Sequence, residues 1–378
     1  MNLPAVPIAQ GLIAFDSVSS KSNAPIADWV ANRLSASRFE VERLSYIDDE
    51  GVEKVCVVAK RGPGEGGIAY FCHNDVVPVE GWNCPYGGPF DGKVAVDRLW
   101  GRGSCDMKGS SAAALAAIEQ ISEHDQRKPI YYIATADEEI GMAGARCVDS
   151  SSRLFEEMVQ HQTVGLVGEP TTLEVVHAHK GGYYLTVISH GRAAHSSTNE
   201  GVNANWAMIP FLQELRDIHA QCQTDTRLQN SMYDPPTLSM NFILVNQPLA
   251  TNVTVARTTC TIFLRPMQDV AWQPLVQQIA DSATRHGLEV LPPTTLNSLY
   301  TSPDRPFVRD VLRIAGKANT RTVCYATDGG YFQRLRDLVV IGPGNIEQAH
   351  CADEWISLEQ LHRGTETFGQ LLRYFACQ

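Results

Sequence analysis

Strand-like and helix-like segments alternate along the first half of the chain, and this alternation limits the fold more than any other feature of the sequence. Short apolar runs bounded by charge or glycine predict strands at residues 52–60, 67–72, 130–136 and 164–168. Amphipathic or alanine-rich runs predict helices at residues 24–37 and 110–121. A chain with this rhythm forms a mostly parallel sheet with helices on both faces, so the expected fold class is α/β.

The middle of the chain follows a different pattern, which predicts a small α+β unit. We expect two strands at residues 183–189 and 252–264, and two helices at residues 205–219 and 273–286. The apolar face of the first helix would consist of Trp206, Ile209, Phe211, Leu212 and Leu215.

The α/β rhythm returns near the C-terminus, where helices are expected at residues 306–317 and 357–375 and a strand at residues 338–341. Turns rich in glycine and proline at residues 180–182 and 291–293 mark the boundaries of the middle unit. We therefore predict one α/β domain formed by residues 1–180 and 294–378, with a second domain, residues 181–293, inserted into it.

The composition narrows the range of functions. The 378 residues carry a formal net charge of −11, which disfavours binding to nucleic acid and to anionic membranes. No apolar run is long enough to span a bilayer, and the first residues lack the basic start and apolar core of a secretory signal. The ten cysteines include no CxxC pair, which indicates reduced thiols rather than a disulfide framework or a thiolate zinc site. We expect a cytoplasmic protein.

Histidine and carboxylate residues gather in the loops that follow the predicted strands, where ligands bind in open α/β sheets. Each of these residues by itself has an ordinary explanation, such as a helix cap, a solvated loop or a surface histidine. Together they supply two imidazoles and at least three carboxylates, a complete ligand set for two divalent ions. Mixed nitrogen and oxygen ligands favour Zn²⁺, with Co²⁺ or Mn²⁺ as alternatives. The histidine and carboxylate residues of these loops are His73, Asp75, Asp106, Glu138, Glu139, Glu169 and His350.

Two of the segments carry additional information. Glycines on both sides of Asp106 allow a tight turn around its carboxylate, which a bridging ligand would require. Asp137, Glu138 and Glu139 are three adjacent carboxylates after a buried strand, and their mutual repulsion is relieved most easily by a cation. One of them can bind a metal while its neighbour acts as a general base.

These segments resemble the M20 family of dinuclear zinc peptidases and deacylases over essentially the whole chain. The motifs HxDxVP, GRGxxDMKG, ADEE, GEPT and AHxxDE occur in the family's order, at residues 73–78, 101–109, 136–139, 168–171 and 349–354. Within the family the chain is most similar to the acetylornithine deacetylase subgroup, on residues 134–139, 142–146, 178–181 and 346–350. The resemblance implies a zinc-aminopeptidase-like catalytic domain, an inserted dimerisation (lid) domain and a homodimer.

The resemblance also implies how two metal ions per subunit would be bound. Asp106 would bridge both ions. His73 and Glu169 would complete one site, and Glu139 and His350 would complete the other.

Roles in catalysis follow from the same resemblance. Asp75 would orient the imidazole of His73, and Glu138 would act as the general base. His195 matches a histidine that reaches the active site from the inserted domain of the partner subunit. The residues that match substrate-side positions of the family are Asn252, Arg265 and Asp328.

The implied reaction is hydrolysis of the amide bond of an N-acyl amino acid. The expected substrate is N-acetylornithine, cleaved to ornithine and acetate in arginine biosynthesis. Phe263 stands where an aspartate is usual, so an N-acetylcitrulline deacetylase, a succinyl-diaminopimelate desuccinylase and a small-peptide carboxypeptidase are alternatives. An inactive binding protein with the same fold is the alternative of another class, and the intact ligand set argues against it. A nucleotide-binding protein is disfavoured, because no GxGxxG follows the first strand and no P-loop occurs.

Overall fold

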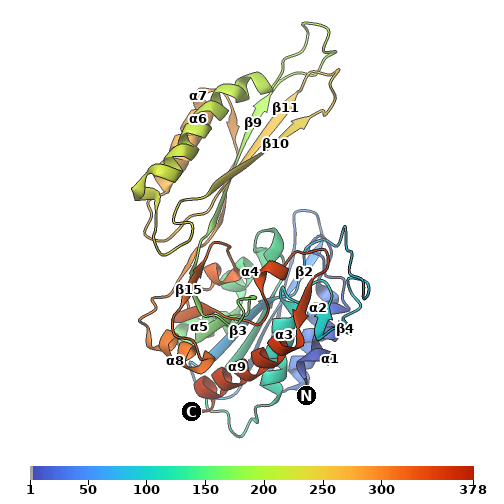
Figure 1. Cartoon of the computed structure of the whole chain (residues 1–378), viewed down its shortest axis with the longest axis vertical. Coiled ribbons are helices and arrows are strands. Elements are labelled where there is room, and N and C mark those ends of the chain that lie inside the picture. The colour runs from blue at the N-terminus through green and yellow to red at the C-terminus, as the bar shows by residue number, and fades with distance from the viewer. Residues whose placement is uncertain (1–2) are drawn as a thin grey trace. The chain divides into compact units, whose positions relative to one another are not determined.

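The computed structural model describes residues 3–378, which form two compact units (Figure 1). The large unit comprises the chain up to Ala178 together with Tyr300–Arg321 and Thr327–Gln378. The small unit comprises His179–Leu299 and Thr322–Ala326. Within residues 3–378, none of the helices combines the length and the apolar character that crossing a bilayer requires.

A nine-stranded sheet forms the centre of the large unit, and its four middle strands run parallel to one another. In spatial order the strands are β1 (Glu40–Ile47), β2 (Glu53–Arg61), β6 (Ile130–Thr135), β3 (Ile68–His73), β7 (Val164–Val167), β16 (Asp337–Val340), β8 (Val176–His179) and β14 (Leu299–Tyr300), with β15 (Arg321–Val323) paired to β8. A smaller sheet consists of β4 (Lys93–Ala95), β5 (Arg98–Trp100) and β17 (Trp355–Ser357). The mostly parallel central sheet confirms the predicted α/β class.

Successive residues of the central strands point to opposite faces of the sheet. In β3, Tyr70 packs edge-on against Phe368, with ring centroids 5.2 Å apart. The next residue, Phe71, stacks on Phe332 at 4.4 Å, and Phe332 contacts Phe155 at 5.3 Å. Phe368 belongs to helix α9 (Leu358–Ala376) and Phe155 to helix α5 (Arg153–Gln160), so helices cover both faces of the sheet.

The helices of the large unit lie where the sequence pattern predicts them, with additional helices between. Alanine-rich α3 is buried from Lys108 to Ile118, because its small side chains allow close packing against α1 and α9. The segments are α1 (Ala5–Ile13), α2 (Ala24–Ala36), α3 (Lys108–Glu119), α4 (Ala143–Ser151), α5 (Arg153–Gln160), α8 (Pro306–Ala315) and α9 (Leu358–Ala376).

The small unit contains more strands than the sequence pattern predicts. Its five-stranded antiparallel sheet has the order β10 (Met240–Gln247), β11 (Arg257–Leu264), β9 (Gly182–His190) and β12 (Glu289–Val290), with β13 (Thr294–Leu296) also paired to β9. Strand β10 is not among the predicted strands because its apolar run, Phe242 to Val245, does not alternate with polar residues. The expected strand at residues 252–264 begins only at Arg257, since the preceding residues form a loop.

Two helices, α6 (Asn205–Thr224) and α7 (Gln273–Arg285), complete the small unit. The predicted apolar face of α6 is partly wrong, because Trp206 is 72% exposed and Ile209 44% exposed. The buried residues of α6 follow the i, i+3, i+4 spacing along a neighbouring stripe, formed by Met208, Phe211, Leu215, Ile218 and Cys222.

Candidate metal centre

The candidate ligands gather at the carboxyl edge of the central sheet. His73 is the last residue of β3, Glu139 lies in the short 3₁₀ turn Glu138–Ile140 that follows β6, and Glu169 follows β7. Because β6, β3 and β7 are neighbours, the loops after them open at the same place. Asp106 comes from the turn before α3, and His350 from the loop before β17. The structure thus brings all five predicted ligands together within the large unit.

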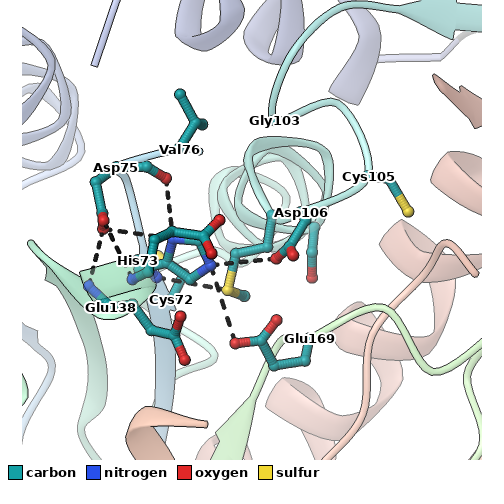
Figure 2. Close-up of polar contacts among 12 residues, drawn as sticks. Cys72, His73, Asp75, Val76, Gly103, Cys105, Asp106, Glu138 and Glu169 are labelled. Atoms are coloured by element: carbon teal, nitrogen blue, oxygen red, sulfur yellow. Dashed lines mark hydrogen bonds and ion pairs between the residues drawn. The ribbon is translucent and has the colours of Figure 1, made fainter. Parts of the chain in front are cut away.

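Asp106 occupies the middle of this cluster. Its Oδ1 lies 3.2 Å from His73 Nε2, and its Oδ2 lies 3.3 Å from His350 Nε2. The same His350 Nε2 is 3.0 Å from Glu139 Oε2. His73 Nε2 is 4.0 Å from Glu169 Oε1 (Figure 2). Each oxygen of one carboxylate therefore faces a different imidazole, as expected of a ligand shared by two ions.

The chemistry of the donors fits divalent cations. Ligand atoms of His73, Asp106 and Glu139 lie within 4.8 Å of one another. Glu139 Oε1 is buried and has no hydrogen-bond partner among the described residues, which leaves one carboxylate oxygen uncompensated. Imidazole nitrogens and carboxylate oxygens in this number are the donors that zinc and similar ions bind.

The pKa values reflect a buried cluster in which acids and imidazoles face each other. Burial, reinforced by the charge of Asp106, raises the pKa of Glu169 well above its usual range. Burial alone would lower the pKa of His73, but hydrogen bonds with Asp106 and Asp75 raise it well above its usual value. Hydrogen bonds with Asp106 and Glu139 raise the pKa of His350 to about 10. A cation at these atoms would replace the protons that the cluster otherwise holds.

Asp75 connects the first ligand to the turn after β6. Its backbone carbonyl oxygen lies 3.0 Å from His73 Nδ1 and its carboxylate Oδ1 lies 3.5 Å from the same atom. The carboxylate also accepts a hydrogen bond from the backbone N–H group of Glu138 at 3.2 Å (Figure 2) and one from that of Glu139 at 3.4 Å. Asp75 is therefore placed to orient His73, and it holds the neighbouring turn as well.

Glu138 differs from the other acids of the cluster. The residue as a whole is partly exposed, and its carboxylate makes no hydrogen bond to another residue in the described part of the chain. Figure 2 shows the side chain extending toward the same side of His73 as Glu169. Burial raises the pKa of Glu138 well above its usual range. A carboxylate in this setting can accept a proton from a nearby water molecule.

Glu354 has a function that its sequence motif does not indicate. This buried carboxylate accepts hydrogen bonds from the backbone N–H groups of Gly103, Cys105 and Asp106 at 2.8, 2.8 and 3.0 Å. It also accepts one from Arg102 Nη1 at 2.9 Å. Glu354 thus holds the turn that presents Asp106. The one hint in the sequence is the glycine-rich turn at residues 101–109, because its backbone N–H groups need hydrogen-bond acceptors.

The predicted substrate residues are divided between the two units. Asp328 lies in the large unit, where it is 3% exposed and accepts a hydrogen bond from Thr135 at the end of β6. Burial raises its pKa to about 7. His195, Asn252 and Arg265 belong to the small unit, and their roles at the metal centre stay predictions.

The unexpected Phe263 has a local packing partner. It stacks on Tyr184 with ring centroids 4.2 Å apart, and the guanidinium of Arg265 lies 4.4 Å from its ring centroid. The phenylalanine thus provides a cation–π contact for the side chain of Arg265, where a carboxylate would form an ion pair.

Comparison with known proteins identifies the family. The sequence model of peptidase family M20/M25/M40 matches residues 69–374. The acetylornithine deacetylase of Proteus mirabilis (strain HI4320) is 31% identical over 375 residues, which cover 96% of this chain and 92% of that protein. The crystal structure of an M20 family metallo-carboxypeptidase from Sulfolobus solfataricus, 14% identical, matches with a TM-score of 0.75 over 98% of this chain and 99% of that one. That of a dinuclear metal-binding M20 peptidase from Bacillus subtilis, also 14% identical, matches with a TM-score of 0.62 over 97% and 96%. The chain belongs to peptidase family M20/M25/M40, and it is a metal-dependent hydrolase that acts on amide bonds.

Proposed function

We propose that the chain removes the acyl group from N-acyl amino acids, and that its substrate is N-acetylornithine, which it hydrolyses to ornithine and acetate. The observation that carries the proposal is the position of Asp106 between His73 and His350, with the carboxylate of Glu138 on the side of His73 where Glu169 lies. The choice of substrate is supported by curated relatives named acetylornithine deacetylase, which match almost the full length at 28–31% identity. The reaction would belong to arginine biosynthesis. All ten cysteines are free thiols within the described residues, which supports a cytoplasmic location.

Two divalent ions per subunit are proposed to complete the centre. His73, Asp106 and Glu169 would hold one ion, and His350 and Glu139 would hold the other together with the second oxygen of Asp106. Zinc suits these donors best, with cobalt or manganese as alternatives. When bound, such ions lower the pKa of water toward neutrality and polarise the carbonyl of the substrate.

Glu138 is proposed to transfer the proton during hydrolysis. Its carboxylate takes a proton from the attacking water as the water oxygen bonds to the acyl carbon. The same proton then passes to the amine nitrogen as the carbon–nitrogen bond breaks, so the products are a carboxylic acid and a free amine. Asp75 keeps His73 oriented through this step. The partner subunit's His195 would donate a hydrogen bond to the oxyanion.

A homodimer is proposed to form through the small unit. Strand β10 is at the edge of the sheet, and Phe242, Ile243, Leu244 and Val245 are 43%, 58%, 44% and 48% exposed. An apolar edge strand with unpaired backbone groups tends to pair with another chain. Because the same strand is present in every copy, a second copy of this chain is the partner that fits it, in a two-fold arrangement.

A panel of substrates on zinc-loaded protein tests the proposed function. N-acetylornithine is expected to show the highest kcat/KM, compared with N-acetylcitrulline, N-succinyl-diaminopimelate and a set of dipeptides. A higher kcat/KM for one of the others would keep the reaction class and replace the substrate. Protein that binds no zinc and cleaves none of them would support the inactive binding protein instead.

A further inference from the structure

We infer that Lys54 and Tyr46, acting through Asp137, hold the turn that carries Glu138 and Glu139 in its working position. Within the described residues, neither side chain bonds to a proposed metal ligand, so both are positioning residues. The inference rests on the proposed role of Glu138 as the general base.

Lys54 is a charged side chain that is completely buried on strand β2, with 0% exposure. Its Nζ lies 2.9 Å from Asp137 Oδ1 and 3.4 Å from Asp48 Oδ2. It also donates hydrogen bonds to the carbonyl oxygens of Ser19 and, at 3.1 Å, Lys21. Burying an ammonium group costs free energy unless the group is paired and hydrogen-bonded, so the buried position of Lys54 depends on these partners.

Asp137 is held through its side chain and its backbone. Its carboxylate receives Lys54 on Oδ1 and a hydrogen bond from Tyr46 Oη on Oδ2, at 2.8 Å. Its carbonyl oxygen accepts a hydrogen bond from the N–H of Met142 at 2.7 Å. The backbone of Asp137 has a φ of 57°, a left-handed conformation that is uncommon for residues other than glycine.

The turn that Asp137 introduces carries both functional glutamates. Glu138 and Glu139 follow immediately, and their N–H groups are held by the carboxylate of Asp75. Lys54 supports this second attachment too, because it binds the carbonyl of Ser19, whose hydroxyl donates to Asp75 Oδ2 at 2.7 Å. Both attachments of the turn therefore depend on one buried ammonium group.

The same sheet contains a matched set of groups outside the glutamate turn. Lys60, six residues later on β2, forms an ion pair with Glu157 at 2.5 Å. Tyr131 Oη donates to the same Glu157 oxygen at 2.8 Å. This lysine, tyrosine and carboxylate repeat the chemistry of Lys54, Tyr46 and Asp137, but their carboxylate lies on helix α5 rather than before the glutamate turn. They provide controls with the same kinds of side chain in a less buried setting.

The experiment compares Lys54→Met and Tyr46→Phe with Lys60→Met and Tyr131→Phe. Each protein is loaded with Co²⁺, whose visible absorption reports ligand geometry, and is assayed with N-acetylornithine. We expect Lys54→Met to lower kcat about 10–100-fold and to change the Co²⁺ spectrum, because Glu139 shifts with the turn. KM should stay within about threefold of wild type, since substrate binding is not removed. Tyr46→Phe should change kcat and the Co²⁺ spectrum in the same direction as Lys54→Met, but by a smaller amount. The control variants should match wild type.

Wild-type kcat and spectrum in both Lys54→Met and Tyr46→Phe would overturn the inference, as would equal losses in the two controls. Tyr46→Phe removes one hydroxyl and leaves the buried ion pair, so it tests the inference even where Lys54→Met does not fold. Failure of the proposed function is seen separately: wild-type protein would then bind Co²⁺ but cleave no N-acyl amino acid. In that case the Co²⁺ spectra of the variants alone decide whether the turn is displaced.

Discussion

At the scale of single residues, Glu138 and its neighbour Glu139 show how adjacent carboxylates take different roles. Glu139 faces His350 Nε2 at 3.0 Å, whereas the carboxylate of Glu138 has no hydrogen bond within the described residues. Glu138→Ala should therefore retain both metal ions and lower kcat roughly 10²–10⁴-fold, the usual contribution of a general acid or base. Metal analysis and steady-state kinetics check this, with the exposed Glu359→Ala as control. Near-normal turnover in Glu138→Ala would refute the assignment.

Glu354 is also a single-residue case, but it is expected to affect metal affinity rather than proton transfer. One carboxylate serves four donors on the Asp106 turn, two on each oxygen. In Glu354→Gln one oxygen becomes an NH₂ group that cannot accept, so two donors lose their partner. We expect metal affinity to fall about 10–100-fold, with kcat largely restored at saturating zinc. Titration with a competing chelator measures the zinc affinity. The neighbouring Asp353→Asn, an exposed carboxylate, is the control, and equal zinc affinities in the two variants would contradict the prediction.

At the scale of elements, the exposed apolar side chains of β10 and the exposed Trp206 of α6 leave a surface of the small unit uncovered in a single chain. Placing a lysine in the middle of the edge strand disfavours pairing with a second strand. Ile243→Lys is therefore expected to shift the protein from dimer to monomer in analytical ultracentrifugation. Val94→Lys, on the edge strand β4 of the large unit, should leave the mass unchanged. The proposal of a homodimer would be contradicted if the wild-type protein sediments as a monomer.

At the scale of the whole molecule, the metal centre couples folding stability to pH. Without metal, the pKa of Glu169 in the folded state is raised by burial, and that of His350 is raised to about 10 by Asp106 and Glu139. A group with a raised folded pKa stabilises the fold at low pH, and this contribution is lost as the pH rises. The Tm of metal-free protein should therefore fall between about pH 5 and about pH 8.

Zinc should reverse this trend, because metal ions and protons compete for the same ligand atoms. The increase in Tm on adding zinc is therefore expected to be larger at the higher pH. Calorimetry of chelated and zinc-loaded protein at the two pH values measures both effects. Equal increases at the two pH values would show that the cluster does not bind the metal through these groups.

The sequence by itself is sufficient for the α/β class and for the choice of candidate ligands. The reason is that strand and helix periodicity is local, and the ends of neighbouring parallel strands necessarily meet at one edge of the sheet. His73, Glu139 and Glu169 can therefore be grouped from their positions after predicted strands. The small unit is less predictable, because β10 and the face of α6 depend on which surface each element packs against rather than on local pattern.

Only the tertiary structure shows which residues hold the ligands of the candidate metal centre in position. Glu354 accepts a hydrogen bond from Gly103 across 251 positions of the sequence, and Lys54 on β2 reaches Asp137 in the loop after β6. A local pattern cannot indicate such contacts, because the partner of a buried donor or charge is whatever the fold brings beside it. The candidate metal ligands can be identified from the sequence, whereas the residues that hold those ligands in position are a property of the packed molecule.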